Sequence, residues 1–236
     1  MNEHEMTSQP QFAQRGETIG RYTARAFIWM AVGLLITFAV SLVCHLTNLS
    51  YIMAIYFPVT IVLSVAEVIL VVLLVAKLRS LPITAARALF LAYAVLNGVV
   101  FSAYFIYFDL PSLALAFGAA GLYFGVMAVV GYTAKVDFSR IRNLLFGGLI
   151  FLLIFGALSM LIPAFTMMDR LMCLVGIVVF MLCTAYDTQK IKAFYNDFQG
   201  DDAMLAKATV ISALELYLDF INLFLYLLRF FGKDND

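Results

Sequence analysis

Four acidic residues of this chain stand inside or at the edge of long apolar stretches. They are Glu67, Asp187, Glu215 and Asp219. A carboxylate near the centre of a bilayer costs at least about 2.5–3.5 kcal/mol on insertion scales, so such residues usually face a cavity or a partner group. Most of the other acidic residues lie in the tails and the predicted loops. These four side chains are therefore the first candidates for a functional site.

The last apolar stretch carries a narrow polar stripe. Ser212, Glu215, Asp219, Asn222 and Tyr226 follow one another at spacings of three and four residues, which places them on one face of a helix. Almost all the positions around them are apolar. A stripe that faced lipid would leave two carboxylates in hydrocarbon, so we expect this helix to lie inside a bundle and to turn its stripe toward an internal polar route.

Asp187 and Asp219 have a defined chemistry if they meet. The helical rise of about 1.5 Å per residue puts Asp187 toward one membrane face and Asp219 nearer the middle, so spacing alone does not bring them together. Two carboxylates a few ångströms apart in a low-dielectric site share a proton and titrate as a pair. Losing that proton leaves two like charges that need a cation or must separate. Carboxylate oxygens suit Ca²⁺, which predicts a pH-sensitive gate that binds Ca²⁺ transiently.

The composition requires a membrane around these residues. Of the 236 residues, 64% are hydrophobic and only 13% are charged, and the mean hydropathy is +0.98. A soluble domain carries about a quarter charged residues. This composition excludes a water-soluble globule, a disordered chain and a disulfide-stapled secreted module. The net charge of zero gives no electrostatic reason to bind nucleic acid.

Seven apolar runs are long enough to be spans of a helical membrane protein. They are Ala26–Leu46, Ile52–Ala76, Ile83–Phe108, Leu113–Thr133, Leu144–Phe165, Leu171–Tyr186 and Ala208–Leu228. The predicted fold is therefore an all-α membrane protein with one domain. We expect a polar tail over residues 1–24, a seven-helix membrane domain over 25–232 and a short polar tail over 233–236.

The basic residues predict the orientation of this domain. With the N-terminus in the cytoplasm, all but three of the 15 Lys and Arg residues fall on the cytoplasmic side, as the positive-inside rule requires. The exceptions are Arg170, Arg229 and Lys233. Seven crossings place the C-terminus outside, whereas a re-entrant last segment would return it to the cytoplasm.

The cysteines point to no cofactor. Cys44, Cys173 and Cys183 all fall within apolar runs, without CxxC spacing and without a His at metal-ligand distance along the chain. We interpret them as small buried residues, and we expect the protein to have no resident cofactor.

Three segments resemble one known family. The run Leu216–Gly232, LYLDFINLFLYLLRFFG, is similar to the C-terminal signature of the Bax inhibitor-1 (transmembrane BAX inhibitor motif) family. Ala185–Lys192 matches the end of that family's sixth helix, and Ile28–Leu35 resembles the opening of its bacterial members. The resemblance covers residues 21–232. It implies six helices around a central seventh and a pH-dependent calcium leak, in a bacterial cell (inner) membrane.

The resemblance also implies roles for individual residues. It makes Asp187 and Asp219 the proton-sharing pair, and Glu67 matches the acidic residue of the family's second helix. That family's basic latch falls at Lys77 or Arg79, and we favour Arg79. The expected leak is closed when the aspartates share a proton and the latch holds Asp187. Glu215 departs from the family pattern, because relatives more often carry a small or uncharged residue there.

Three other functions remain open. An intramembrane aspartyl protease also pairs two aspartates, but Leu216-Tyr-Leu before Asp219 lacks a Gly-x-Gly-Asp motif and no Pro-Ala-Leu element follows. A proton-coupled transporter would favour inverted repeats and broken helices, which we do not detect. A stress or cell-death regulator that acts through protein partners is not distinguished by the sequence. We expect a non-enzymatic protein whose partners are the bilayer, Ca²⁺ and H⁺.

Overall fold

The computed structural model describes residues 17–77, 80–162 and 168–232, and helices account for nearly all of this part of the chain. The helices of the first half are α1 (Ile19–Leu46), α2 (Leu49–Ile55), α3 (Phe57–Lys77), α4 (Ile83–Phe101) and α5 (Tyr104–Tyr107). Those of the second half are α6 (Leu110–Thr133), η1 (Phe138–Ile141), α7 (Arg142–Leu161), α8 (Asp169–Asp197) and α9 (Asp202–Phe231). The predicted all-α fold class is confirmed.

The turn between α8 and α9 sets the register of the two helices that carry the acidic residues. Gly200 adopts a φ of 97°, a left-handed conformation that glycine reaches without a steric cost. The Asp201 carboxylate then accepts a hydrogen bond of 2.9 Å from the amide N–H of Met204, which satisfies one of the free donors at the start of α9. The reversal is short, so α8 and α9 are antiparallel neighbours.

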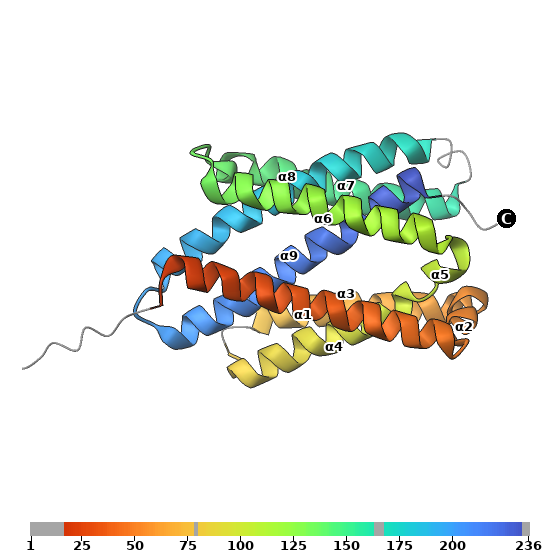
Figure 1. Ribbon diagram of the computed structural model, residues 1–236, viewed down its shortest axis with the longest axis horizontal. Coiled ribbons are helices and arrows are strands. Elements are labelled where there is room, and N and C mark those ends of the chain that lie inside the picture. Colours follow the sequence, from red (N-terminus) through yellow and green to blue (C-terminus); the bar gives the residue numbers. More distant parts are fainter. Residues whose placement is uncertain (1–16, 78–79, 163–167, 233–236) are drawn as a thin grey trace, which may run out of the picture.

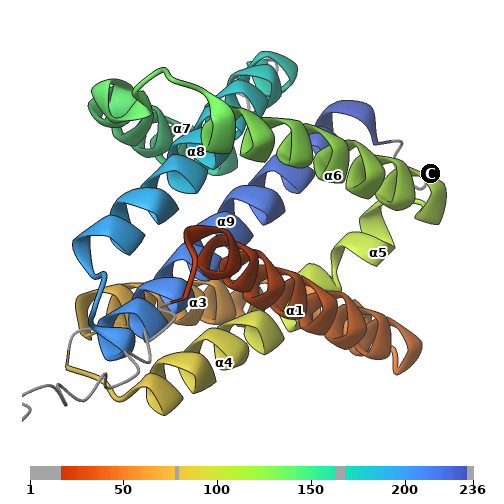
Figure 2. The same ribbon diagram turned by 60° about the vertical axis from the view of Figure 1, so that its left-hand side comes forward.

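Helix α9 runs between two groups of helices (Figures 1 and 2). It packs most extensively against α8 and also contacts α1, α4 and α6. Among the long apolar helices it has the largest buried share, and the side chains of Tyr217, Leu223 and Phe224 are almost fully buried. The helix that carries the polar stripe is thus enclosed by protein along much of its length.

Six helical segments of the described chain are long and apolar enough to cross a membrane. They correspond to six of the seven predicted runs, which makes the chain a multi-pass membrane protein. The second predicted run, Ile52–Ala76, is divided between α2 and α3 at Tyr56, two residues before Pro58. Proline has no amide donor and its ring clashes with the carbonyl four residues earlier, so it fits the first turn of α3 but could not stand inside one continuous helix. The seven-span count, and the central place of the last helix among six others, stay predictions.

Two helices extend beyond the predicted runs. Helix α1 begins at Ile19, inside the segment predicted as a polar tail, and α8 continues to Asp197 rather than ending near Tyr186. Hydropathy marks where lipid surrounds a helix, and polar residues can continue the same helix into water. Asp187 consequently lies in the interior of α8.

Candidate functional site: an acidic pair in a cavity beside α9

The main candidate site is a cavity of about 800 Å³ lined by side chains of α7, α8 and α9. Its polar and charged lining comprises Arg142, Tyr186, Asp187, Lys190, Glu215, Asp219, Asn222 and Tyr226. The apolar lining comes largely from α7, including Leu145, Leu149 and Leu152. Helix α7 packs against α8 and forms the far wall of the cavity.

Asp187 and Asp219 meet in this cavity. The antiparallel register brings the two carboxyl groups within hydrogen-bonding reach of each other. Asp219 is only 5% exposed, and its buried Oδ2 atom has no hydrogen-bond partner within the described ranges, whereas Asp187 is half-buried. A buried carboxyl oxygen without a donor is costly unless it carries a proton or meets a cation. The geometry thus brings together the two residues whose separation the sequence left open.

A cation and a third carboxylate lie one helical turn away. Lys190 Nζ donates a hydrogen bond of 2.5 Å to Glu215 Oε1, and the two side chains are 27% and 24% exposed. Lys190 follows Asp187 by three residues, and Glu215 precedes Asp219 by four. The Lys190–Glu215 ion pair therefore lies next to the two aspartates, on one side of them along the helices. Lys190 was not among the predicted site residues, because the sequence placed it just beyond Asp187 among the basic residues of the predicted cytoplasmic side.

The polar stripe of α9 divides between two environments. Glu215, Asp219, Asn222 and Tyr226 line the cavity, and the Asn222 side-chain amide donates a hydrogen bond of 2.8 Å to the carbonyl of Leu218. Ser212 is buried and does not line this cavity. Four of the five stripe residues thus share one polar surface.

Glu67 belongs to a different polar cluster, which α3 forms with α1, α4 and α9. Its Oε1 atom is buried and has no hydrogen-bond partner among the described residues, and its side chain lies near the hydroxyl groups of Tyr93 and Tyr217. Thr37 Oγ1 lies 2.5 Å from the Tyr217 hydroxyl and donates a hydrogen bond of 2.9 Å to the Ala94 carbonyl. Glu67 does not line the cavity that holds the aspartates.

Of the two latch candidates, only Lys77 belongs to the part of the chain that the structure describes. Arg79 lies outside the described residues, and Lys77 is exposed at the end of α3. The basic side chains that line the cavity are Lys190 and Arg142. The latch role of Lys77 or Arg79 stays a prediction.

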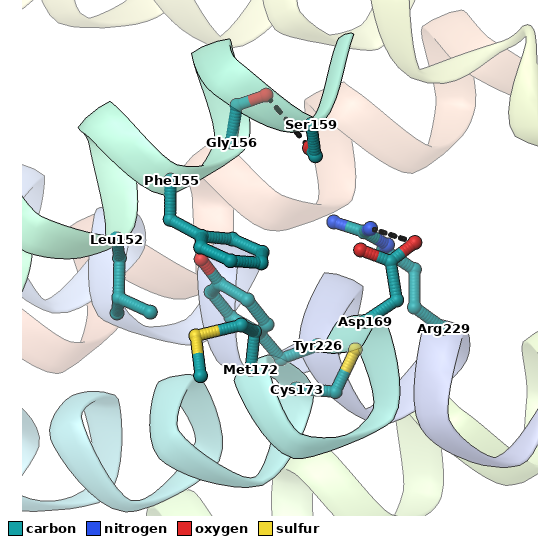
Figure 3. Close-up of a pocket in the computed structure, with 9 residues that line it drawn as sticks. All are labelled: Leu152, Phe155, Gly156, Ser159, Asp169, Met172, Cys173, Tyr226 and Arg229. Carbon is teal, nitrogen blue, oxygen red and sulfur yellow. Dashed lines mark hydrogen bonds and ion pairs between the residues drawn. The ribbon is translucent and has the colours of Figure 1, made fainter. Parts of the chain in front are cut away.

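A second ion pair lies at the other end of the α8–α9 seam. Arg229 Nη2 is 3.3 Å from Asp169 Oδ2, and both residues line a small cavity of about 20 Å³ together with Tyr226 and Leu152 (Figure 3). Asp169 stands in the first turn of α8 and Arg229 in the last turn of α9, where each charge also complements the helix dipole. Sequence analysis did not connect these two residues, because they are 60 positions apart and only the helix register unites them.

Among the described residues, no group of three or more His, Cys, Asp or Glu side chains is arranged to hold a metal ion. The three cysteines are buried and unpaired. The cavity therefore offers two interacting carboxyl groups, an adjacent Lys–Glu ion pair and an amide. Such an arrangement can hold and release a proton, and it can contact a passing cation, without a full ligand set.

These features define the class of the protein: a multi-pass helical membrane protein with an acidic pair buried against its last long helix. The family model described as "Inhibitor of apoptosis-promoting Bax1" matches residues 20–236. The chain is 36% identical over 216 residues to the inner membrane protein YbhL of Escherichia coli K12, a match that covers 90% of this chain and 91% of the relative. It is 31% identical over 241 residues to a protein of Deinococcus radiodurans, with 100% and 98% covered. The chain belongs to the Bax inhibitor-1 family.

Proposed function

We propose that this protein is a pH-sensitive leak pathway for Ca²⁺ in the bacterial inner membrane, with Asp187 and Asp219 as its gate. The observation that carries the proposal is the meeting of these two carboxyl groups in a large cavity, with one carboxyl oxygen left without a donor. Two carboxyl groups this close in a low-dielectric site cannot both ionise at low cost, so they share one proton. The number of protons on the pair therefore sets the charge that a cation meets in the cavity.

The closed form in this proposal has one proton shared by the pair and a basic side chain that holds the remaining negative charge. Arg79 is the latch that the sequence favours. Lys190 lies in the cavity one turn from Asp187, but its charge is already balanced by Glu215, so the latch must come from another basic residue. Any change in the proton count of the pair then disturbs a balance of charges, which makes ion passage depend on pH.

The experiment is Ca²⁺ flux into liposomes that contain the full chain, measured from pH 5 to pH 8. We expect flux of the unmodified protein to change across this range, and Asp187→Asn and Asp219→Asn to flatten that profile, because an amide cannot exchange the shared proton. Asp197→Asn is the matched control, since Asp197 is an exposed carboxylate on the same helix α8.

The outcomes separate the alternatives. If the pH profile survives both substitutions, the di-aspartyl gate is wrong. If no flux appears at any pH, the channel itself is wrong, and a regulator that acts through protein partners becomes the better hypothesis. Ca²⁺ flux that requires an opposing proton gradient would favour a proton-coupled transporter. Peptide cleavage that disappears in Asp219→Asn would favour the protease.

A further inference from the structure

Tyr226 separates the large cavity from the small one at the end of the α8–α9 seam. It lines both cavities, as does Leu152 of α7. The large cavity measures about 800 Å³ and the small one about 20 Å³. A space of roughly 10–15 Å³ on this measure is enough for one water molecule. The small cavity beside Tyr226 therefore has room for little more than one water molecule.

The aromatic ring of Tyr226 is held in place by α8. A Cβ atom added to Gly176 would lie 2.6 Å from Tyr226 Cδ1 and Cε1 and 2.7 Å from Cδ2, so the ring lies face-on against the glycine backbone. One turn along α8, Phe180 stacks on the same ring at a centroid distance of 5.8 Å and an interplanar angle of 28°. Only a residue without a side chain at position 176 leaves room for this arrangement.

Residues of α7 and the terminal ion pair line the small cavity together with this ring. Figure 3 shows Phe155 beside Tyr226, with Leu152 on one side and the Asp169–Arg229 pair on the other. The ion pair joins the first turn of α8 to the last turn of α9. A lateral movement of either helix end would break the ion pair and shift the surface against which the ring packs.

We propose that Tyr226, seated on Gly176 and tied in by the Asp169–Arg229 ion pair, is a second closure of the ion route, distinct from the aspartate gate. This inference rests on the proposed leak function, because it assigns a further constriction to the same cavity. Tyr226 follows Asp219 by seven residues, which is two helical turns or about 10 Å. A cation that leaves the acidic pair toward the Asp169 end must displace this ring.

Cys183 provides a probe of the closure that does not depend on ion flux. Its side chain lines the large cavity together with those of Asp187 and Asp219. The experiment labels Cys183 with a positively charged, membrane-impermeant methanethiosulfonate reagent in a full-length Cys44→Ala/Cys173→Ala background. Reagent is applied to each membrane face separately, in spheroplasts and in inverted vesicles. A parallel sample carries Arg170→Cys, which puts a thiol at an exposed position next to Asp169. The membrane face from which this thiol is labelled is the face that carries Asp169.

We expect Tyr226→Ala to raise the labelling rate of Cys183 from the Asp169 face by about tenfold or more, because the thiol no longer needs a local opening to be reached. Tyr226→Phe keeps the ring and should retain the slow rate. Phe231→Ala is the matched control, since it removes an exposed aromatic ring from the same end of α9 outside both cavities. In the flux assay, Tyr226→Ala should raise Ca²⁺ leak at every pH while preserving its pH dependence.

Two results would overturn the closure: an unchanged Cys183 labelling rate in Tyr226→Ala, or an equal rise in Phe231→Ala. Neither result contradicts the proposed aspartate gate if Asp187→Asn still flattens the pH profile of Ca²⁺ flux. Increased labelling in Tyr226→Ala without Ca²⁺ flux in any variant would instead support the closure and refute the calcium leak.

Discussion

The Lys190–Glu215 ion pair gives the sharpest quantitative test of the proposed site. Glu215→Gln removes one negative charge and keeps a hydrogen-bond acceptor for Lys190, so the lysine becomes an unbalanced positive charge beside the aspartates. Lys190→Met does the reverse, because it leaves the Glu215 carboxylate without its cation. The two single substitutions should therefore change cation affinity in opposite directions, and the double variant should return close to the original value.

The size of the effect follows from the helix geometry. Residues three or four positions apart on a helix are about 6 Å apart, and two unit charges at that separation interact by about 2.8 kcal/mol at an effective dielectric constant near 20. The side chains of Lys190 and Glu215 are 27% and 24% exposed, so solvent and salt reduce this value. We expect about 1–2 kcal/mol, which is roughly 5- to 30-fold in affinity.

The assay is the Ca²⁺ concentration that gives half-maximal flux in liposomes at pH 7. Glu215→Gln should raise this concentration and Lys190→Met should lower it. Lys135→Met is the matched control, because it removes a positive charge from an exposed position between α6 and α7 and should leave the value unchanged. If both single variants shift the concentration in the same direction, the ion pair acts through packing, and the electrostatic reasoning is wrong.

Three further predictions concern the elements that hold the site. Gln189 accepts a hydrogen bond from the amide of residue 138 and donates one to the carbonyl of residue 136, so Gln189→Ala should speed hydrogen exchange over residues 134–141, measured by mass spectrometry. The serine at position 139 hydrogen-bonds Asp137 and lowers the pKa of its carboxyl group. This turn is therefore stabilised above the ordinary Asp pKa and loosens as pH falls through the lowered value, which Asp137→Asn should abolish in exchange experiments. Thr37→Val leaves the buried Tyr217 hydroxyl without its partner, and it should cost about 1–3 kcal/mol, seen as a lower melting temperature that Thr37→Val/Tyr217→Phe partly restores.

The sequence was sufficient to predict the helices but not all of their limits. Apolar runs located six long spans because only helices satisfy their own backbone hydrogen bonds in lipid. The same runs could not show that α8 continues to Asp197, since the residues beyond the lipid are polar while the helix goes on. The break at Tyr56 was accessible in principle, because Pro58 cannot stand in the interior of one continuous helix.

The candidate site was predicted residue by residue but not as a constellation. The cost of buried charge singled out Asp187 and Asp219, and spacing placed Glu215 on the same helix face as Asp219. Which residues of α8 meet which residues of α9 depends on the turn at Gly200 and on the lateral packing of the two helices. That register is a tertiary property, and it alone reveals that Lys190 neutralises Glu215.

The register also shows how charge is distributed along the α8–α9 seam. Lys190 meets Glu215 toward one end and Asp169 meets Arg229 at the other, so each of these contacts is electrically neutral. Asp187 and Asp219, between them, are both acidic. Opposite charges brought together largely cancel each other's field, whereas two carboxyl groups must share a proton or attract a cation. Neutral contacts on either side thus leave the aspartate pair as the level of the seam where acidic groups meet without a basic partner of their own.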